Sequence, residues 1–560
     1  MVHRGGDIDS ENIYIEGDNL DALKILRETY LGKVKMIYID PPYNTGNDFI
    51  YEDDFSQSST DYSDNSGQTD EEGNRLVQNS ESNGRFHTDW LNMIYPRLRI
   101  AKDLLKDDGA IFIHCDEHEN AALQIICREI FGRKNELGTI IWDKRNPKGS
   151  VVGIAYQHES ILVYCKNIYL FSKVPFSRKK EHALAMLDKA QELIRNDGRV
   201  TTNVRKAFKK YIKDHKNILT GGEAAYNLID DQGNIYQAVS MAAPDKPETR
   251  SHRPLVHPIT GKECPVPAKG WRYTDETMDW LLDLNKIDFG EDESTQPRQK
   301  YYLKDNMSES VPSLLYYGGS GDTLGLPFDN PKPLIVEQKM IYTLAKGCDD
   351  IVLDFFSGSA TTAHAVMQLN AEDGGHRRYI MVQLPEITDK NSEAHKAGYQ
   401  TICDIGEERI RRAGKKIKEE TGADIDYGFR CFKVDSSNMK DVYYKPADIK
   451  QAEMDLFADN IKEDRTPEDL LIQVMLDLGV LLSSKIEEKE IAGKKVFSVE
   501  NGYLIACFDE KVTEEVVTAI AQQHPYYAVF RDSSMADDSV AANFEQIFMT
   551  YSPQTVRKVL

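Results

Sequence analysis

A short apolar strand that stops at two consecutive prolines limits most strongly what this chain can fold into. The run at 34–39 is apolar enough for a buried strand, and Asp40-Pro41-Pro42-Tyr43 follows it directly. Two prolines in a row cannot continue a sheet. The preceding residues predict a strand at 12–16 and a helix whose first turn is capped by Asp18. A strand–helix–strand unit of this length predicts a parallel pairing with a right-handed crossover.

The same alternation continues along the chain and then stops for about 150 residues. Further strands are expected at 109–114, 139–142, 161–164, 351–354 and 379–383, and helices at 117–131, 361–369 and 394–420. From about 170 to 325 the sequence changes to a basic helical stretch at 178–216 and an irregular part rich in Pro and Gly. An acidic α+β pattern fills the region after about 430. One α/β domain is therefore expected to be interrupted by an inserted domain.

Composition narrows the classes of protein further. The mean hydropathy is −0.52, and no run approaches the ~18 apolar residues that a membrane helix needs, so we expect no membrane association. Eight cysteines without a C-x-x-C pair predict buried thiols in a reducing cytoplasm. The net charge of −22 disfavours a nucleic-acid partner as a first guess, because phosphate binding needs cations. Residues 171–220, however, carry 13 bases and five acids, so the basic charge is local.

The turn at 40–43 offers the groups that activate an exocyclic amine. Asp40 supplies a carboxylate, Pro42 locks the carbonyl of Pro41, and Tyr43 supplies an aromatic face. Two acceptors aimed at one NH₂ group make its lone pair available for attack, and Tyr43 can stack on the ring that carries the amine. Such a turn lies beyond the carboxyl end of a parallel strand, where open α/β sheets bind ligands. The alternative is a rigid turn that only ends the strand.

A second turn, at 354–362, follows an apolar strand and opens a helix. Gly358, Ser359 and Ala360 let a ligand approach the backbone at the helix N-terminus. No Gly-Lys-Ser/Thr follows, so a nucleoside triphosphate is not the expected ligand. The alternative is a tight strand-to-helix turn.

Together the two turns resemble those of the DNA amino-methyltransferases, and in particular the adenine-N6 enzymes with the signature Asp-Pro-Pro-Tyr. Asp354, Phe356 and Gly358 match that family's turn for S-adenosylmethionine (SAM), Asp-x-Phe-x-Gly-x-Gly, while Ala360 stands where Gly is usual. Ala disfavours a positive φ. The catalytic turn precedes the cofactor turn, with a long insert between them. This is the order of the family's β group, in which the insert recognises the target.

Longer stretches resemble the modification subunits of type III restriction–modification systems. They include 15–23, 40–55, 71–91, 330–334, 382–386 and 530–533. The resemblance implies an α/β fold: a Rossmann-like, class I SAM-dependent methyltransferase sheet, circularly permuted, with an inserted target-recognition domain and a C-terminal α+β domain. The expected domains are the catalytic half at 1–169, the recognition insert at 170–325, the cofactor half at 326–435 and an interaction domain at 436–560.

The resemblance also assigns residues to roles. The catalytic residues it implies are Asp40, Pro41, Pro42 and Tyr43. The SAM-binding residues it implies are Asp18, Lys332, Pro333, Asp354, Phe356, Gly358, Ser359, Ala360, Thr361 and Gln383. Asp18 is expected to bond the cofactor's adenine, although a helix cap explains it equally well. Gln383 stands where the family usually has an acid for the ribose, with Glu386 three residues on as the other candidate.

The sequence also predicts DNA contacts, a loop that covers the flipped base, and a site without a metal. Double-stranded DNA is the expected partner. We expect phosphate contacts from basic residues of the insert, namely Lys206, Lys209, Lys210 and Lys213, and from a short basic segment before the insert, namely Lys144 and Arg145. The alternative is a merely solvated helix. The acidic loop at 48–90 is expected to close over a flipped adenine, with His87 and Trp90 as surface or packing residues. No metal is expected, even though His114, Asp116 and His118 cluster in sequence, because transfer from a sulfonium needs none.

The expected activity is methyl transfer from SAM to adenine N6 in DNA after base flipping. The alternatives are a stand-alone adenine methyltransferase, a cytosine-N4 methyltransferase, and a silent DNA-reading subunit. By resemblance to type III systems, we expect a cytoplasmic homodimer that recruits an ATP-dependent restriction subunit through residues 436–560.

Overall fold

The computed structural model falls into two compact units. The first comprises Met1–Pro175 with Pro312–Leu560, and the second comprises Phe176–Val311. The residues described are 1–45, 49–51, 76–78, 86–145, 154–319, 321–328, 331–347, 349–440, 461–531, 534–536 and 538–560. The loop predicted to close over the base, at 48–90, lies mostly outside these ranges.

A large mixed sheet forms the centre of the first unit. Among the described residues ten strands pair in the order β1-β18-β2-β17-β16-β3-β6-β8-β7-β15. Their bounds are β1 (Val2–Gly6), β2 (Ile13–Glu16), β3 (Val34–Ile39), β6 (Leu105–Cys115), β7 (Glu136–Asp143), β8 (His158–Cys165), β15 (Leu314–Tyr316), β16 (Ile351–Asp354), β17 (Arg378–Gln383) and β18 (Arg430–Lys433).

The order of the strands is that of a Rossmann-like sheet whose halves are exchanged along the chain. Strands β2, β17, β16, β3 and β6 are parallel neighbours. β8 is antiparallel to both β6 and β7. The neighbouring strands β17 and β16 come from late in the chain and are flanked by β2 and β3 from its beginning. The predicted fold class, a circularly permuted α/β sheet, is therefore confirmed.

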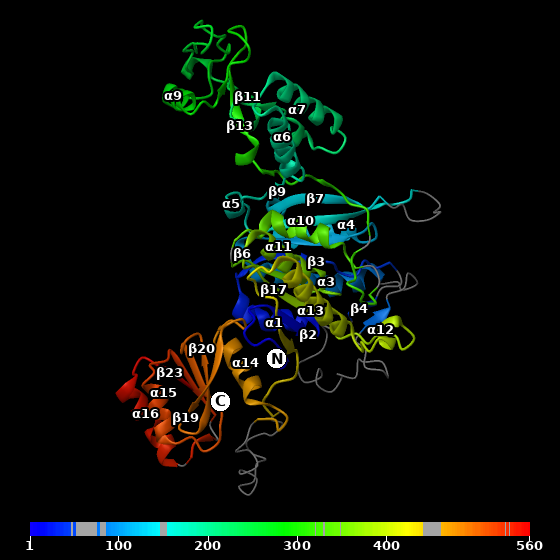
Figure 1. Cartoon of the computed structure of the whole chain (residues 1–560). Helices are drawn as coiled ribbons and strands as arrows, with labels where there is room; N and C mark the ends of the chain where they lie inside the picture. The colour runs from blue at the N-terminus through cyan, green and yellow to red at the C-terminus, as the bar shows by residue number, and fades with distance from the viewer. Residues whose placement is uncertain are drawn as a thin grey trace. The chain divides into compact units, whose positions relative to one another are not determined.

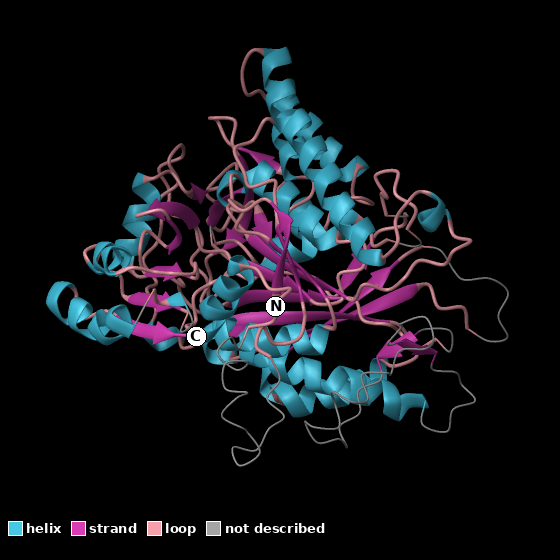
Figure 2. Ribbon diagram, turned by 90° about the horizontal axis from the view of Figure 1, so that it is seen from below, coloured by secondary structure: helices cyan, strands magenta, loops and turns pink. Residues whose placement is uncertain are grey.

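Helices cover both faces of this sheet (Figures 1 and 2). On one face α1 contacts α3 and α14, and α3 contacts α4; on the other, α11 contacts α10 and α13. The bounds are α1 (Asn19–Tyr30), α3 (Phe86–Leu104), α4 (Asn120–Phe131), α5 (Ile168–Phe171), α10 (Leu334–Leu344), α11 (Thr361–Asp373), α12 (Glu393–Lys396), α13 (Ile402–Thr421) and α14 (Pro467–Asp477), with a 3-10 turn, η1 (Arg133–Asn135), and a hairpin of β4 (Phe49–Tyr51) and β5 (Leu76–Gln78).

Two helices predicted as continuous are broken by glycine. The single helix expected at 394–420 is wrong, because Gly398 adopts φ +96° after α12 and α13 begins afresh with a capping box at Thr401. The basic stretch expected at 178–216 is likewise two helices, α6 (Ala183–Asp197) and α7 (Thr202–Asp214), separated at Gly198 with φ +74°. A positive φ is the left-handed conformation that ends a helix.

The second unit is built on two small cores. In the first, α6 and α7 enclose Met186, Phe208 and Ile212; in the second, Trp271 and Met278 are fully buried. A four-stranded sheet in the order β10-β11-β13-β12 connects them. The remaining elements are α8 (Gly221–Ala224), α9 (Asp275–Asp283), β9 (Arg178–Lys179), β10 (Leu228–Ile229), β11 (Ile235–Ser240), β12 (Ile287–Asp288), β13 (Arg298–Tyr302), β14 (Ser308–Glu309), η2 (Pro247–Thr249) and η3 (Leu303–Asp305).

The C-terminal segment shares its core with the methyltransferase sheet. Leu471 and Met475 of α14 belong to the same buried cluster as Leu26 of α1. Arg430 Nη1 of β18 donates to the carbonyls of Leu482 (2.7 Å) and Ser484 (2.9 Å). A cut after residue 435 would therefore leave a buried cation without acceptors. Beyond α14 a five-stranded sheet packs against two helices: β19 (Ile486–Ile491), β20 (Lys494–Val499), β21 (Leu504–Cys507), β22 (Tyr527–Phe530), β23 (Val556–Val559), α15 (Glu514–Ala521) and α16 (Asp538–Tyr551).

Two expectations from composition concern the described residues directly. The described cysteines are free and buried, as expected. Within the described ranges, no helix has both the length and the apolar character that crossing a membrane requires.

Candidate active site

The two turns singled out in the sequence lie side by side at the carboxyl edge of the central sheet. β3 and β16 pair in parallel with Ile37 opposite Leu353, so Asp40 and Asp354 emerge next to each other. From this point β16 leads to β17 on one side of the sheet, and β3 leads to β6 on the other. Such a topological switch point is where open α/β sheets bind ligands.

The catalytic turn is held in place by buried residues around it. Trp90 is fully buried, and its Nε1 donates to the carbonyl of Pro42 at 2.8 Å. Asn44, with φ +61°, donates through Nδ2 to Glu119 Oε1 at 2.6 Å. Trp90 is thus a packing residue, as predicted. The turn keeps one shape because its carbonyl and the residue after it are both anchored.

The two carboxylate oxygens of Asp40 differ in their hydrogen bonding. Its Oδ2 lies 3.2 Å from Nζ of Lys332. Its Oδ1 is buried and has no hydrogen-bond partner among the described residues. Leaving a buried acceptor unsatisfied costs free energy, so this oxygen is a ready acceptor for a donor that enters the site.

Lys332 lies at the centre of the catalytic turn, whereas the resemblance placed it beside the cofactor. Its Nζ donates to the hydroxyl of Tyr43 at 2.6 Å and to Oε2 of Glu159 at 2.9 Å, and it stands 4.9 Å above the ring of Tyr43. The Tyr43 hydroxyl in turn donates to Glu159 Oε2 at 3.2 Å. Lys144, predicted to contact DNA, pairs with the other oxygen of Glu159.

The charges in this network hold each other in the ionised form. Burial alone would raise the pKa of Glu159, but Lys332, His114 and Lys144 hold that pKa well below its usual range. Burial would lower the pKa of Lys332, and Asp40 and Glu159 raise it instead. Burial and the Asp40 carboxylate raise the pKa of Tyr43 well above its usual range. Two carboxylates therefore face two ammonium groups, with a neutral phenol between them.

A buried histidine backs the network on the sheet side. His114 Nε2 lies 2.6 Å from the hydroxyl of Tyr38, and its Nδ1 lies 3.8 Å from Glu159 Oε2. Burial lowers the pKa of His114, so its imidazole is neutral. The sequence patterns indicated neither Tyr38 nor Glu159, and they suggested His114 only as a possible metal ligand. A charged residue at the start of an apolar strand, as Glu159 is, was the one available signal.

The cofactor turn is shaped by a buried carboxylate and two left-handed residues. Asp354 accepts from the backbone N–H of Phe356 (3.1 Å) and from the hydroxyl of Thr362 (2.7 Å). Gly358 has φ +50°, and Ala360 has φ +60° and ψ 38°. Ala360 thus adopts the left-handed conformation that glycine takes more readily than alanine, at a backbone cost of about 1 kcal/mol. The predicted residues Ser359 and Thr361 are buried beside them.

Asp354 shares its hydroxyl donor with a second acid. Thr362 Oγ1 also lies 3.0 Å from Oε2 of Glu337. Burial and the Asp354 charge raise the pKa of Glu337 well above its usual range, and burial raises the pKa of Asp354 to about 7. Because one hydroxyl proton cannot serve two carboxylates, a protonated Glu337 supplies the second hydrogen.

Gln383 fixes the cofactor turn. Its Oε1 accepts from the backbone N–H of Gly358 at 2.7 Å, and its Nε2 donates to the carbonyl of Leu384. Burial raises the pKa of Glu386 to about 7. The role of either residue toward a ribose stays a prediction.

Asp18 is the N-cap of α1, as predicted. Its Oδ1 accepts from the N–H groups of Leu20 (2.9 Å) and Asp21 (3.1 Å), and its Oδ2 lies 3.4 Å from Arg97. The adjacent Asn19 donates to the carbonyl of Phe355 at 2.8 Å, which joins the helix after β2 to the cofactor turn. Pro333 is the N-cap residue of α10.

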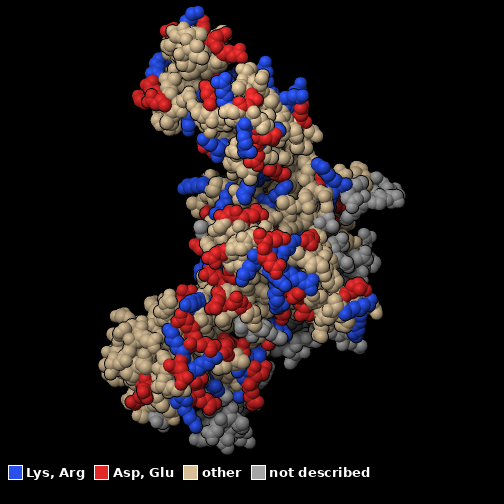
Figure 3. Space-filling model, in the orientation of Figure 1, with Lys and Arg blue, Asp and Glu red and all other residues tan. Residues whose placement is uncertain are grey.

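The predicted DNA contacts fall in two places. Lys206, Lys209, Lys210 and Lys213 are exposed on α7, opposite its buried Phe208 and Ile212. On the face drawn in Figure 3, Lys and Arg are interspersed with Asp and Glu over α6 and α7. Their spacing of three and four residues forms one stripe. In the other unit, the guanidinium of Arg145 lies 5.6 Å above the ring of Tyr316.

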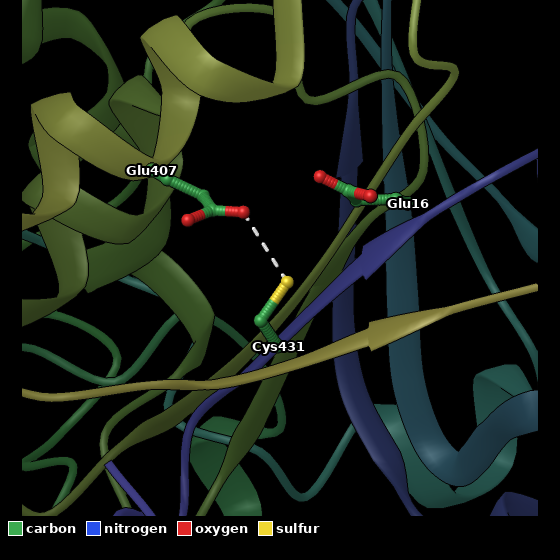
Figure 4. A group of neighbouring side chains, drawn as sticks. All are labelled: Glu16, Glu407 and Cys431. Carbon is green, nitrogen blue, oxygen red and sulfur yellow. Dashed lines mark hydrogen bonds between the residues drawn. The ribbon is translucent and has the colours of Figure 1, made fainter. Parts of the chain in front are cut away.

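Two groups of side chains in the described ranges could approach a metal ion. Asp116, Glu117 and His118 form one, apart from the buried His114. Glu16, Glu407 and Cys431 form the other, and Figure 4 shows their side chains converging at β2, α13 and β18. There the Cys431 thiol donates to Glu407 Oε1 at 3.2 Å, and burial raises the thiol's pKa. A neutral thiol is a poor ligand, and the expectation of no metal stays a prediction.

Replacing Asp354 by alanine is expected to lower the affinity for SAM about 30-fold, because it leaves the Phe356 N–H and the Thr362 hydroxyl without an acceptor and loosens the turn. Isothermal titration with S-adenosylhomocysteine measures the effect. Asp349→Ala is the matched control, because Asp349 is exposed near the opposite end of the same strand. Equal affinities of the two variants would show that Asp354 does not shape the cofactor site.

The family of the chain follows from comparison with known proteins. Residues 34–414 match the DNA methylase family, and the chain belongs to it. It is a DNA methyltransferase, and its cofactor is S-adenosylmethionine. The type III restriction-modification enzyme EcoP15I Mod subunit of Escherichia coli is 34% identical over 557 residues, which cover 96% of this chain and 81% of that protein. Within the DNA methylases, the chain is a member of the modification (Mod) subunits of type III restriction–modification systems.

Further relatives include a second Mod subunit and a type II methyltransferase. The EcoPI Mod subunit of Escherichia phage P1 is 30% identical over 92% of this chain and 78% of its own length. The type II methyltransferase M.KpnI of Klebsiella pneumoniae is 31% identical over 72% of this chain and 88% of its own length. Among solved structures, the M1.HpyAVI–SAM complex matches at a TM-score of 0.29 with 12% identity, over 71% of this chain and 98% of that one.

Proposed function

We propose that this protein methylates N6 of adenine in duplex DNA, as the modification and recognition subunit of a type III restriction–modification system. The observation that carries the proposal is the Oδ1 atom of Asp40 in an intact Asp-Pro-Pro-Tyr turn. This oxygen is buried and accepts no hydrogen bond from the described residues. It stands at the switch point of the sheet, next to the cofactor turn. A base stacked in a duplex cannot reach such a buried acceptor, so the adenine is flipped out of the helix.

The residues of the turn then divide the work. Asp40 Oδ1 and the Pro41 carbonyl accept the two protons of the adenine amine, and the ring of Tyr43 stacks on the base. Both acceptors are fixed before the base arrives, because the turn is held by Trp90 and Asn44. Positioning of this kind supplies much of the rate enhancement when the methyl group is already activated.

The cofactor turn fits SAM by its shape and its unsatisfied groups. The left-handed residues Gly358 and Ala360 expose the backbone at the start of α11. Ser357 Oγ is buried there without a hydrogen-bond partner among the described residues, as expected of a group that a polar ligand satisfies. Asp18, Asp354, Phe356 and Thr361 surround the same edge of the sheet. SAM supplies an electrophilic methyl group on a sulfonium.

A cytosine-N4 activity is the main alternative, since an exocyclic amine is the nucleophile in both reactions. The signature of those enzymes more often begins with Ser, so Asp40 favours adenine. Transfer of a tritiated methyl group to DNA, followed by hydrolysis and separation of the nucleosides, distinguishes the two. The proposal expects label in N6-methyladenine, and label in N4-methylcytosine would contradict it.

The same proposal assigns partners to the remaining parts of the chain. The insert at 170–325, whose stripe of exposed lysines lies on α7, reads the DNA site. The C-terminal segment at 436–560 forms a homodimer and contacts an ATP-dependent restriction subunit. Its outer surface over α15, α16 and β23 is largely uncharged on the face in Figure 3, which suits protein contacts better than phosphate.

An exposed pair of tyrosines provides a test of the C-terminal contacts. Tyr503 and Tyr526 are 42% and 51% exposed and stack at 5.1 Å. Replacing both by lysine is expected to raise the dimer dissociation constant about tenfold or more, because aromatic anchors dominate interfaces. Light scattering measures the mass, and Tyr169→Lys, at another exposed tyrosine, is the control. An unchanged dimer together with a lost cofactor affinity would contradict this assignment.

A further inference from the structure

The ammonium of Lys332 is shared among three acceptors at the catalytic turn. Its Nζ lies 3.2 Å from Asp40 Oδ2, 2.9 Å from Glu159 Oε2 and 2.6 Å from the hydroxyl of Tyr43. An ammonium carries three N–H donors, so these contacts use all of them. The Lys332 side chain is 14% exposed, which leaves little access for water to replace any of the three.

Because Lys332 is shared among three acceptors, Asp40 keeps more of its capacity to accept hydrogen bonds from the adenine amine. A cation held only by Asp40 would neutralise the carboxylate that has to accept the amine protons. A second carboxylate on the same ammonium competes for it, because in a partly buried site each attraction is stronger than it is in water. Glu159 stands closer to Nζ than Asp40 does. Asp40 therefore keeps one oxygen positioned by Lys332 and the other, Oδ1, open.

Glu159 also fixes the aromatic ring of the turn. Its Oε2 accepts from the Tyr43 hydroxyl at 3.2 Å, while its Oε1 pairs with Lys144. The side chain of Glu159 is 6% exposed. Glu159 belongs to β8, which lies between β6 and β7 in the sheet and pairs with both. Because Glu159 is anchored in the sheet, it can keep the side chains of Tyr43 and Lys332 in fixed positions.

We propose that Glu159 is a positioning residue of the methyl transfer, which draws Lys332 off Asp40 and orients the ring of Tyr43. The inference rests on the proposed function, since it concerns how the same turn meets the adenine amine. In this proposal Glu159 does not contact the reacting groups, and it acts through its bonds with Lys332 and Tyr43.

Two variants of Glu159 show whether its charge or its shape matters for methyl transfer: glutamine keeps the shape, and aspartate keeps the charge. Glu159→Gln is expected to lower the single-turnover rate of methyl transfer about 30-fold, with the affinity for S-adenosylhomocysteine within about twofold of the unmodified protein. Glu159→Asp keeps the charge and is expected to retain more activity than Glu159→Gln. If glutamine retains as much activity as aspartate, shape and not charge matters, and the inference is overturned.

A double-mutant cycle tests whether Glu159 acts through Lys332. In a Lys332→Met background the competition for the cation no longer exists, so Glu159→Gln is expected to cost at least about tenfold less than it does alone. An equal cost in both backgrounds would overturn the proposed route. Glu136→Gln is the matched control, since Glu136 stands on the neighbouring β7 in a surface pair with Arg128.

The outcomes separate this inference from the proposed function. If the unmodified protein transfers no methyl group to adenine in DNA, both are overturned. If it does, and Glu159→Gln stays within about threefold of it, only the role of Glu159 is overturned. Thermal unfolding of each variant is measured in parallel, and the comparison of Glu159→Asp with Glu159→Gln is made at a temperature where both are folded.

Discussion

Asp40→Ala is expected to lower the rate of methyl transfer about a thousandfold while DNA and SAM still bind. The buried Oδ1 of Asp40 is the acceptor in place for the adenine amine, and its loss removes about 4 kcal/mol of transition-state stabilisation at 1.36 kcal/mol per decade. The effect falls on the chemical step, because Asp40 contributes neither to the cofactor turn nor to the lysine stripe on α7. Single-turnover transfer of tritiated methyl to DNA measures it.

The control is a second acid at the same edge of the sheet. Glu386→Gln alters a half-buried carboxyl after β17 without touching the catalytic turn, and it is expected to act on SAM binding rather than on the transfer rate. A transfer rate for Asp40→Ala within about tenfold of the unmodified protein would remove Asp40 from the mechanism.

Neutralising Lys206, Lys209, Lys210 and Lys213 together is expected to weaken DNA binding about 100-fold at low salt, for all sequences alike. The four side chains are exposed along one stripe of α7, which suits binding to successive phosphates. Removing one lysine that binds a phosphate reduces the slope of log K against log salt by about 0.9, so the slope falls by about 3.6 when all four are neutralised. Fluorescence anisotropy with labelled duplexes across a salt series measures both quantities.

Four lysines elsewhere provide a control with the same change in net charge. Lys24, Lys396, Lys415 and Lys485 are exposed on the other unit, and their replacement by glutamine is expected to leave the slope nearly unchanged. If the α7 variant kept the slope of the unmodified protein, its lysines would be a solvated face and nothing more.

Local patterns in the sequence predicted the parts of the fold that neighbouring residues determine. The strand at 34–39 ends at Ile39, just before Asp40 and the two prolines that follow it, and Asp18 caps α1 through its own side chain, as a helix-capping residue does. The permuted sheet was predicted from the resemblance to the β group of the DNA amino-methyltransferases and not from local patterns. The end of the strand and the helix cap depend on interactions within a few residues, which a sequence displays directly.

The parts that were missed depend on interactions between distant segments. Lys332 bonds Glu159 across 173 positions of the chain, and no pattern near either residue indicates the other. Ala360 takes a left-handed conformation against its own preference because the buried turn around it dictates the backbone. The C-terminal segment merges with the central core through Arg430 and α14, whereas its composition suggested an independent domain.

The most direct test of the central claim is the chemistry of the methylated base in DNA. A host without adenine methylation expresses only this protein, or its Asp40→Ala variant, and plasmid DNA from each is digested to nucleosides for mass spectrometry and sequenced for modified positions. We expect N6-methyladenine within one recurring sequence in the first sample and none in the second. N4-methylcytosine in the first sample, or N6-methyladenine in both, would contradict the account.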